Sequence, residues 1–362
     1  MANSKNMASF SVLSVVLLFT AIGSGFSQAP EVPTWELSGY AQMAIDGSKS
    51  IENAERAVKT AEEKLEEVRL AGATELDLED ARTNVEAAKL ALAETVRTVS
   101  YQSVTIYVSY LRAVRNSGFS ERSLEIAKST ADISKQRFEE GVKTEAAYLA
   151  DVTAVLNAEI AFLQSENALE SARRSLLRFV DIDVNTRARI ADAKLPFVNL
   201  IIDKNELRTA IQAAGSGYNR SKSVAESARK RNDALSRLSR SVTQKELEAS
   251  TLSAQNASDA FSKATAETED QTWNLLSTLE VLTKTVEAGE QMLSIAENAW
   301  EKRAEQYLFG LISALERDEH ELSFDKSRDS AIRKVEDHFF HVLKIEKARG
   351  NDLVTLLEEK VR

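Results

Sequence analysis

The sequence predicts an all-α fold, built from two tandem repeats of long antiparallel coiled-coil helices. Three observations support this prediction. The 362-residue chain contains only 3 Pro and 12 Gly, and the prolines at positions 30, 33 and 196 all lie outside the predicted helices. Apolar residues recur every seven positions over long stretches, as they do in coiled coils. One turn motif also occurs twice, which indicates a duplicated unit.

The repeated motif is an aromatic residue, a glycine three positions later and a hydroxyl residue three positions after the glycine. A glycine can adopt the left-handed conformation that ends a helix, and the hydroxyl of Ser or Thr can cap the next helix. Each motif is therefore predicted to form the tip of a helical hairpin. The first tip contains Phe138, Gly141 and Thr144, and the second, 169 residues later, contains Tyr307, Gly310 and Ser313.

The chain divides into four segments. Residues 1–27 have the features of a secretory signal, because Lys5 precedes an apolar core that small residues follow. An uncleaved N-terminal anchor is the alternative for this segment. Residues 28–180 form the predicted first helical repeat, residues 181–204 a linker without heptad periodicity, and residues 205–362 the second helical repeat.

The first repeat is predicted to hold three helices, over residues 37–70 with a loosening at Gly47, residues 75–140 and residues 145–180. The middle helix would be about 100 Å long at ~1.5 Å per residue, and each of its neighbours about half that length. Two half-length helices should therefore pack end to end along one long helix. Heptad rows of alanine and leucine give residues 145–180 a wide apolar face, which predicts contacts on two sides.

The second repeat follows the same plan. A helix over residues 205–239 is expected to end at a break over 241–243, and a long helix then runs to about Leu308. The last helix is predicted from about residue 314 to residue 347, and residues 349–351 end it. Trp273 and Trp300 occupy apolar positions of the long helix, so we expect both in the core.

Charge and cysteine content limit the possible partners. The net charge is −10 and the isoelectric point is about 5.2. This argues against a surface for nucleic acid or anionic lipid, because both need clustered Lys and Arg. The chain contains no Cys, so neither disulfide bonds nor cysteine-linked lipids are expected.

The sequence predicts no enzyme, no cofactor and no metal site. It has no Ser-His-Asp order, no Gly-rich phosphate loop and no zinc motif. His338 and His341 have a helical i,i+3 spacing that can seat a metal ion. Their neighbours Phe339 and Phe340 favour a packing stripe instead.

The two tips carry a family resemblance. The run Arg137-Phe138-x-x-Gly141-x-x-Thr144, which precedes a long Ala-rich helix, resembles the hairpin of TolC-like outer-membrane efflux proteins. Its second copy is the run from Tyr307 to Ser313. The resemblance covers about residues 36–350.

The resemblance implies a homotrimer whose six repeats close into a hollow helical cylinder through the periplasm, with tips that engage a periplasmic adaptor protein. Glu316 and Glu319 would then line the pore entrance, which Tyr307 would help to close. Helix caps without a partner are the alternative for the tips, and a solvated helix face is the alternative for the two glutamates. The partner-binding tip residues that the resemblance implies are Arg137, Phe138, Gly141, Thr144, Tyr307, Gly310 and Ser313.

The sequence departs from the family pattern in two ways. Ala147 and Ile312 replace an acidic and a basic residue of the family's charged gate, which argues against a gate of that kind here. The family also places two membrane-spanning β-strands between the first two helices of each repeat. Only residues 71–74 and 240–243 occupy those places, whereas one membrane strand needs about 9–11 residues. We therefore expect the chain to lack its own barrel and doubt that it inserts directly into a membrane.

Three functions fit these observations. The first is an exported, TolC-like periplasmic conduit or docking component of an envelope efflux or transport assembly, located in the periplasm or associated with the outer membrane. The second is a structural periplasmic coiled-coil spacer or tether without transport activity. The third, an adaptor that docks onto such channels, ranks last because adaptors contain β-rich domains and no segment here alternates convincingly.

Overall fold

The computed structural model describes residues 33–237 and 243–361. The predicted signal segment, residues 1–27, lies outside the described residues. The helices are α1 (Leu37–Asp46), α2 (Lys49–Leu70), α3 (Glu75–Glu139), α4 (Glu145–Phe179), α5 (Lys204–Ala214), α6 (Ser216–Arg237), α7 (Gln244–Leu308), α8 (Ala314–Arg349) and α9 (Leu353–Lys360). Two short strands, β1 (Thr34–Trp35) and β2 (Arg189–Ile190), complete the described elements. The predicted all-α class is confirmed.

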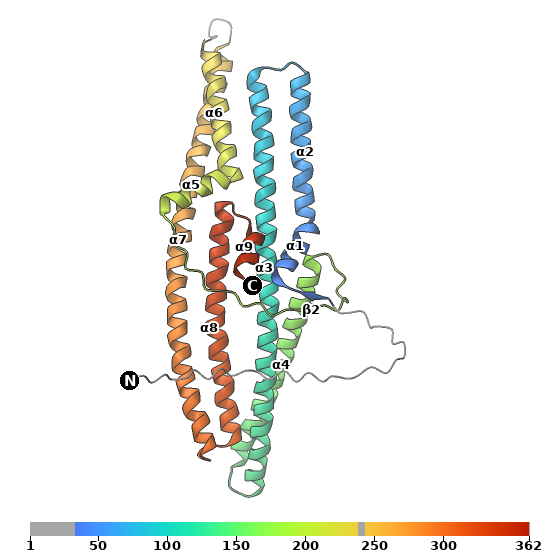
Figure 1. Ribbon diagram of the computed structural model, residues 1–362, viewed down its shortest axis with the longest axis vertical. Coiled ribbons are helices and arrows are strands. Elements are labelled where there is room, and N and C mark those ends of the chain that lie inside the picture. The colour runs from blue at the N-terminus through green and yellow to red at the C-terminus, as the bar shows by residue number, and fades with distance from the viewer. Residues whose placement is uncertain (1–32, 238–242, 362) are drawn as a thin grey trace, which may run out of the picture.

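Two long helices form the shafts of the molecule. Helices α3 and α7 are each 65 residues long, or about 100 Å. In the first repeat, α2 packs along the upper half of α3 and α4 along its lower half (Figure 1). Helices α6 and α8 flank α7 in the same way. The predicted arrangement of one long helix with two stacked half-length partners is thus present in both repeats.

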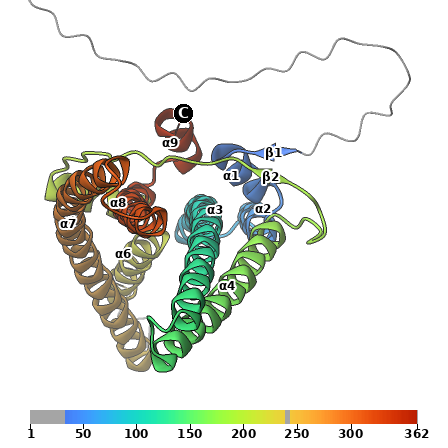
Figure 2. The same cartoon turned by 90° about the horizontal axis from the view of Figure 1, so that it is seen from below.

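The lower helices form an arc in the order α7, α8, α3, α4 (Figure 2). The two repeats meet where α3 packs against α8 and, higher up, against α6. Helices α4 and α7 are therefore the two edges of the arc. Each packs on a partner on one side and exposes its other side.

The hydrophobic core lies at the waist, where the stacked helices meet. Tyr40 of α1 is fully buried, and its hydroxyl donates to the carbonyl oxygen of Leu176 near the end of α4, at 2.8 Å. Tyr107 of α3 is also fully buried, and its hydroxyl lies 2.8 Å and 2.6 Å from the carbonyl oxygens of Trp35 and Ala191. These bonds satisfy buried polar groups that would otherwise be costly. They fix the junction of α1, α3 and α4.

The linker between the repeats runs across this waist. Its strand β2 pairs in parallel with β1, with Thr34 opposite Arg189 and Trp35 opposite Ile190. No helix forms between α4 and α5, in residues 181–203, where heptad periodicity is absent. The short strand pair was not predicted, because two residues per strand leave no alternation to detect.

Several boundaries differ from the predictions. The sequence predicted a loosened helix at Gly47 and a continuous helix at Gly215. In the structure each of these glycines separates two helices. A short helix, α9, follows Gly350, which takes the left-handed conformation at φ 89°. The first predicted break is confirmed by Gly72 at φ 65° and by Thr74, which caps α3. Part of the second break, residues 240–242, lies outside the described residues.

The prediction for Trp273 is wrong. This side chain is 61% exposed rather than buried in the core. Trp300 is partly buried and stacks on Phe324, with ring centroids 6.4 Å apart. The difference arises because Trp273 lies on the outward face of α7, at the edge of the arc, where the chain itself supplies no partner.

Candidate functional site

The first hairpin tip is closed by backbone bonds and a charge pair. Gly141 takes the left-handed conformation at φ 74°, and the amide of Val142 donates to the carbonyl oxygen of Arg137 at 2.8 Å. These features end α3 as a Schellman motif does. The hydroxyl of Thr144 then accepts from the amide of Ala147 at 3.3 Å and caps α4.

Side chains reinforce this first tip. Phe138 stacks on Tyr148 with ring centroids 5.5 Å apart. The ammonium of Lys143 pairs with Asp151, and the hydrogen bond from Lys143 holds the pKa of Asp151 below its usual range. The tip is thus locked within its own hairpin, while Arg137 and Val142 stay exposed.

The second tip has the same backbone with different side chains. Gly310 has φ 72°, and the amide of Leu311 donates to the carbonyl oxygen of Gln306 at 2.8 Å. Ser313 and Glu316 form a capping box, because the amide of Glu316 donates to the Ser313 hydroxyl at 3.2 Å and the Glu316 carboxylate accepts from the Ser313 amide at 2.8 Å. The guanidinium of Arg317 lies 4.7 Å from the centroid of the Tyr307 ring.

The second tip exposes more apolar surface than the first. Leu308, Phe309 and Leu311 are 72–80% exposed, and residues 308–312 carry no charge. In the first tip, residues 137–143 include four charged side chains. The structure therefore shows that the two predicted tips share a backbone and differ in surface chemistry.

The two predicted pore residues have different environments. The carboxylate of Glu316 takes part in the cap of α8, where it accepts a hydrogen bond from the backbone amide of Ser313. This hydrogen bond is the main cause of the lowered pKa of Glu316. Glu319 is exposed on α8. Capping accounts for Glu316 within a single chain, so its predicted place at a pore entrance stays a prediction, as does that of Glu319.

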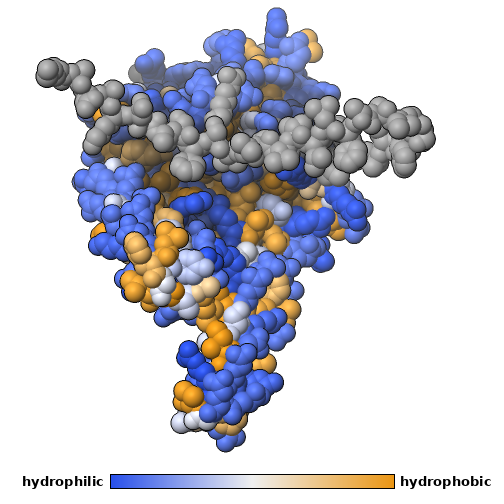
Figure 3. All heavy atoms as spheres, turned by 60° about the horizontal axis from the view of Figure 1, so that its bottom comes forward, coloured by the Kyte–Doolittle hydropathy of each residue, from blue (hydrophilic) through white to orange (hydrophobic). Residues whose placement is uncertain are grey.

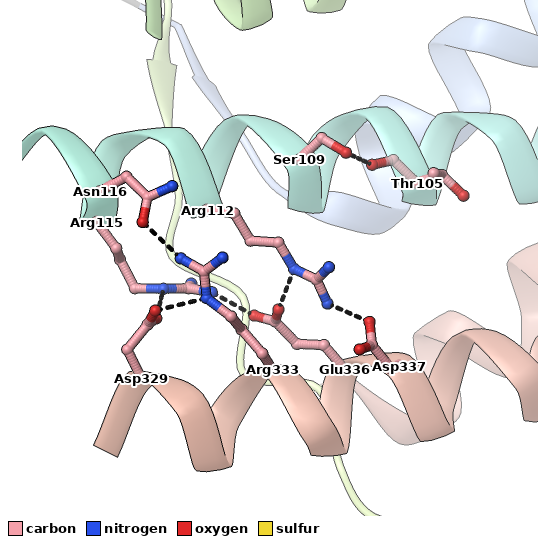
Figure 4. Close-up of polar contacts among 9 residues, drawn as sticks. All are labelled: Thr105, Ser109, Arg112, Arg115, Asn116, Asp329, Arg333, Glu336 and Asp337. Carbon is pink, nitrogen blue, oxygen red and sulfur yellow. Dashed lines mark hydrogen bonds and ion pairs between the residues drawn. The ribbon is translucent and has the colours of Figure 1, made fainter. Parts of the chain in front are cut away.

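A network of charged side chains joins the two repeats at the junction of α3 and α8 (Figure 4). Arg112 and Arg115 of α3 both reach Glu336 of α8, at 2.6 Å and 2.7 Å. Arg115 also binds Asp329 at 2.5 Å, and Arg333 binds the same carboxylate at 2.6 Å. Glu336 is only 2% exposed. Its two arginine partners compensate the charge that this burial would otherwise destabilise.

Sequence analysis missed this network. Its α3 residues stand more than 200 positions from its α8 residues, and each is unremarkable in a chain that is 28% charged. The available signal was the i,i+3 spacing of Arg112 with Arg115, which puts both guanidinium groups on one face of a long helix. That signal does not identify the partner helix.

The histidine pair packs between helices, as the neighbouring phenylalanines predicted. His338 is fully buried and lies against Phe197 of the linker, with ring centroids 4.6 Å apart. The Nε2 atom of His341 lies 2.7 Å from the carbonyl oxygen of Leu275 in α7. Burial lowers the pKa of both imidazoles. Among the described residues, no group of three or more His, Asp and Glu side chains could hold a metal ion.

Helix α4 is rich in apolar residues. It is long and apolar enough to cross a membrane when length and composition alone are considered. In the folded chain it packs along α3 and leaves leucines on its other face exposed. The predicted second contact of this helix is therefore not supplied by the chain itself.

Comparison with solved structures finds similar folds in outer-membrane proteins. The outer-membrane channel OprN superposes with a TM-score of 0.63 and 14% identity, over 88% of this chain and 90% of OprN. VceC from Vibrio cholerae gives a TM-score of 0.55 and 16% identity, over 87% and 96% of the two chains. CmeC from Campylobacter jejuni gives 0.60 and 10%, over 90% and 89%.

Neither protein-family models nor curated protein sequences gave a match. The evidence for kinship is therefore structural, and at 10–16% identity it concerns the fold. The chain has the fold of the TolC-like outer-membrane efflux channels.

Proposed function

We propose that this chain is an exported component of an envelope efflux or transport assembly, in which its helical shaft serves as a periplasmic conduit or docking element. The observation that carries the proposal is the arc of two hairpin repeats, with both tips at one end and both edges unpartnered (Figures 1 and 2). An arc with two open edges can be continued by further copies into a closed wall. Two of the similar solved structures, OprN and CmeC, are channels of the outer membrane.

The proposed assembly is a homotrimer, and the proposed partner of its tips is a periplasmic adaptor protein. Both tips are hairpin turns at the same end of the molecule (Figure 1). Arg137 and Val142 at the first tip and Phe309 at the second are available to a partner. Rigid caps favour such a role, because a preorganised turn loses little conformational freedom on binding.

We further propose that the chain has no outer-membrane barrel of its own. Residues 71–74 join α2 to α3 directly, and Thr74 already caps α3, so no strand intervenes at this position. A barrel, if the assembly has one, would then come from another chain. The predicted export signal supports a location in the periplasm, and no catalytic site is proposed.

The oligomeric state tests the proposed assembly. Size-exclusion chromatography with light scattering on residues 28–362 should give a mass of three copies at micromolar concentration. Electron-microscopy class averages should show a ring with a central hole in end-on views. A strictly monomeric rod under these conditions would overturn the conduit.

A second candidate function is a structural spacer or tether without transport activity. The direct turn at residues 71–74 favours it, because a spacer needs no membrane strands. Class averages discriminate between the two functions, since a solid bundle without a central hole supports the spacer. Copurification with envelope transport proteins supports the docking component.

A further inference from the structure

A pocket opens between α3 and α8, beside the charge network that joins the two repeats. It encloses about 430 Å³, far more than the ~30 Å³ of one water molecule, so it can hold a small solute. Hydrophilic residues, in blue, cover much of the lower shaft around orange apolar patches (Figure 3). The residues that line the pocket are mainly polar. They are Asn116, Phe119, Ser120 and Ser123 of α3, and Lys326, Asp329, Ser330 and Arg333 of α8.

The two walls of this pocket are built on the same spacing. On each helix three polar residues stand at i, i+4 and i+7, which places them on one face. They are Asn116, Ser120 and Ser123 on α3, and Lys326, Ser330 and Arg333 on α8. The guanidinium of Arg333 donates to Oδ1 of Asn116 at 2.7 Å (Figure 4). At the other end, the ammonium of Lys326 donates to the Ser123 hydroxyl at 3.2 Å. The two serines at i+4 therefore stand between these bonds, at about the same height.

The acceptors in these walls are already used. Among the described residues that line the pocket, Asp329 is the one carboxylate. Its Oδ1 accepts from Arg115 at 2.5 Å and its Oδ2 from Arg333 at 2.6 Å. The Ser123 hydroxyl accepts from Lys326 and donates to the carbonyl oxygen of Phe119 at 2.8 Å. The carboxylate charge that could repel an anion is thus paired twice.

The donors of the two cations are only partly used. An ammonium has three N–H donors and a guanidinium has five. Lys326 uses one of them on Ser123, and it has no carboxylate partner among the described residues. Arg333 uses one on Asp329 and one on Asn116. The pocket therefore has charged donors at both ends, about two helical turns apart.

Neutral donors and the local charge add to this surplus. The amide nitrogen of Asn116 and the hydroxyls of Ser120 and Ser330 are further donors, and none of them is used in a hydrogen bond between described side chains. The network and the pocket together contain one cation more than acids, although the whole chain carries −10. The groups counted are Arg112, Arg115, Lys326 and Arg333, and Asp329, Glu336 and Asp337. A pocket that offers donors and positive charge suits an anion.

We propose that this pocket binds a small oxyanion of the phosphate or sulfate class. Lys326 and Arg333 supply charged donors, and the hydroxyls of Ser120 and Ser330 supply neutral ones between them. The bound ion contacts α3 of the first repeat and α8 of the second, so it ties the two repeats together beside their buried charge network. The proposal goes beyond the proposed function, because the pocket lies within a single chain and needs no second copy.

A titration of inorganic phosphate into the full chain tests the site, with line broadening in phosphorus NMR as the measure of binding at constant ionic strength. Lys326→Met removes the ammonium and breaks no ion pair among the described residues. Losing one charge-assisted hydrogen bond should weaken phosphate binding by about tenfold or more. Sulfate should compete with phosphate for the site, and chloride at the same ionic strength should not.

The matched control is Lys334→Met. It removes the same charge from the same helix, but Lys334 lies in the groove toward α7, where its Nζ is 3.7 Å from the sulfur of Met292. Phosphate affinity should change by less than about twofold, because solvent and salt screen a charge that does not touch the ion. An equal loss in both lysine variants would assign binding to general charge and overturn the pocket.

Ser330→Asp is a second, independent test. Ser330 is exposed, so the fold should tolerate the change. The new carboxylate can accept from the donors of the pocket in place of the ion. Phosphate binding should be lost, and the melting temperature in phosphate-free buffer should rise above that of the parent chain. A fall in melting temperature together with unchanged phosphate binding would contradict the proposal.

The outcomes are separate from those of the proposed assembly. Phosphate that binds to a monomer supports the pocket while the conduit fails. A trimer that shows no line broadening at millimolar phosphate overturns the pocket and leaves the conduit standing. Phosphate also raises melting temperatures by its exclusion from protein surfaces. An increase of the same size in the parent chain, Lys326→Met and Ser330→Asp would be that general effect and would overturn the site.

Discussion

The junction between the two repeats and the outer edges of the arc use opposite chemistry. Where α3 meets α8, arginines of α3 bind buried carboxylates of α8. Arg115 bridges two of them, Asp329 and Glu336. The outer faces of α4 and α7 present rows of Leu, Ile and Val with few charges. The two repeats are covalently joined, so their junction needs specificity more than affinity. The edges must attract a separate molecule, for which apolar burial is the stronger driving force.

The inner junction should be the most sensitive place in the chain. Glu336→Gln removes the charge that Arg112 and Arg115 share and leaves both guanidinium groups partly buried without it. Breaking a buried pair from one side costs about 3–5 kcal/mol. The free energy of unfolding, measured by chemical denaturation, should fall by an amount in this range.

The control for this variant is Glu287→Gln. Glu287 pairs with Lys284 one turn away on α7 at 2.9 Å, and both side chains are exposed. Exposed pairs of this type contribute ~0.3–0.5 kcal/mol. Equal effects of the two substitutions would show that the network at the junction does not stabilise the chain.

The outer edges should respond differently. Leu156→Asp puts a charge on the open face of α4, which the proposed assembly would cover, without disturbing the single chain, because Leu156 is exposed there. Burying an unpaired carboxylate and losing a leucine contact should weaken association by at least about 30-fold, the equivalent of ~2 kcal/mol. Analytical ultracentrifugation would measure the shift toward monomer.

Leu70→Asp is the matched control for the edge. Leu70 is also highly exposed and lies at the end of α2, far from the tips. Association should be unchanged in this variant. A loss of association in Leu70→Asp of the same size would mean that added charge, rather than the open face of α4, governs assembly.

Most of the architecture could be read from the sequence because long coiled-coil helices are specified locally. The heptad rows, Gly141, Gly310 and their hydroxyl caps each act within a few residues of their own position. Because the tip motif recurs 169 residues later, each inference about the first repeat could be applied to the second. The breaks at Gly47 and Gly215 were harder to place, because a glycine in a helical pattern ends the helix only when the neighbouring packing requires it.

The candidate site could be predicted less completely. Apolar periodicity identified α4 as a helix with two packing faces, and the structure leaves one of them open. The same reasoning placed Trp273 in the core, because a heptad pattern does not distinguish a face covered by the same chain from one that remains open. The inner network involved pairs more than 200 residues apart, and charge spacing does not determine which helices will meet.

Acid pH should weaken the packing of α8 against α7 and the linker. His338 is buried against Phe197 and Thr283, and its Nδ1 atom has no hydrogen-bond partner among the described residues. Burial depresses the pKa of His338 and His341 below the ordinary value near 6.5. The unfolded chain therefore takes up protons first as the pH falls, so stability is full above about pH 6.5 and declines below it.

The double variant H338Q/H341Q should remove most of this dependence. Thermal unfolding from pH 8 to pH 5 would measure it, with the parent chain losing more than the variant over that range. Lys344 on α8 and the acids Glu267 and Asp270 on α7 line the hollow beside His341, and they are present in both proteins. Parallel pH profiles would assign the loss to those groups instead.

The smallest predicted effects concern the hydroxyl caps of the two tips. Thr144→Ala removes the hydroxyl that accepts from Ala147, and Ser313→Ala removes the one that accepts from Glu316. Each loss should cost about 1 kcal/mol of helix stability, felt mainly in the first turn of α4 or α8. Amide hydrogen exchange of those turns would measure it.

The increase in amide hydrogen exchange should differ between the two tips. Ser313→Ala leaves the Glu316 carboxylate still accepting from the backbone at position 313, so α8 keeps half of its capping box. Thr144 has no such reciprocal partner, although Lys143 and Asp151 still hold the hairpin together. Exchange should therefore rise more in the first turn of α4 than in that of α8. The reverse order would mean that the charge pair, rather than the cap, maintains the first tip.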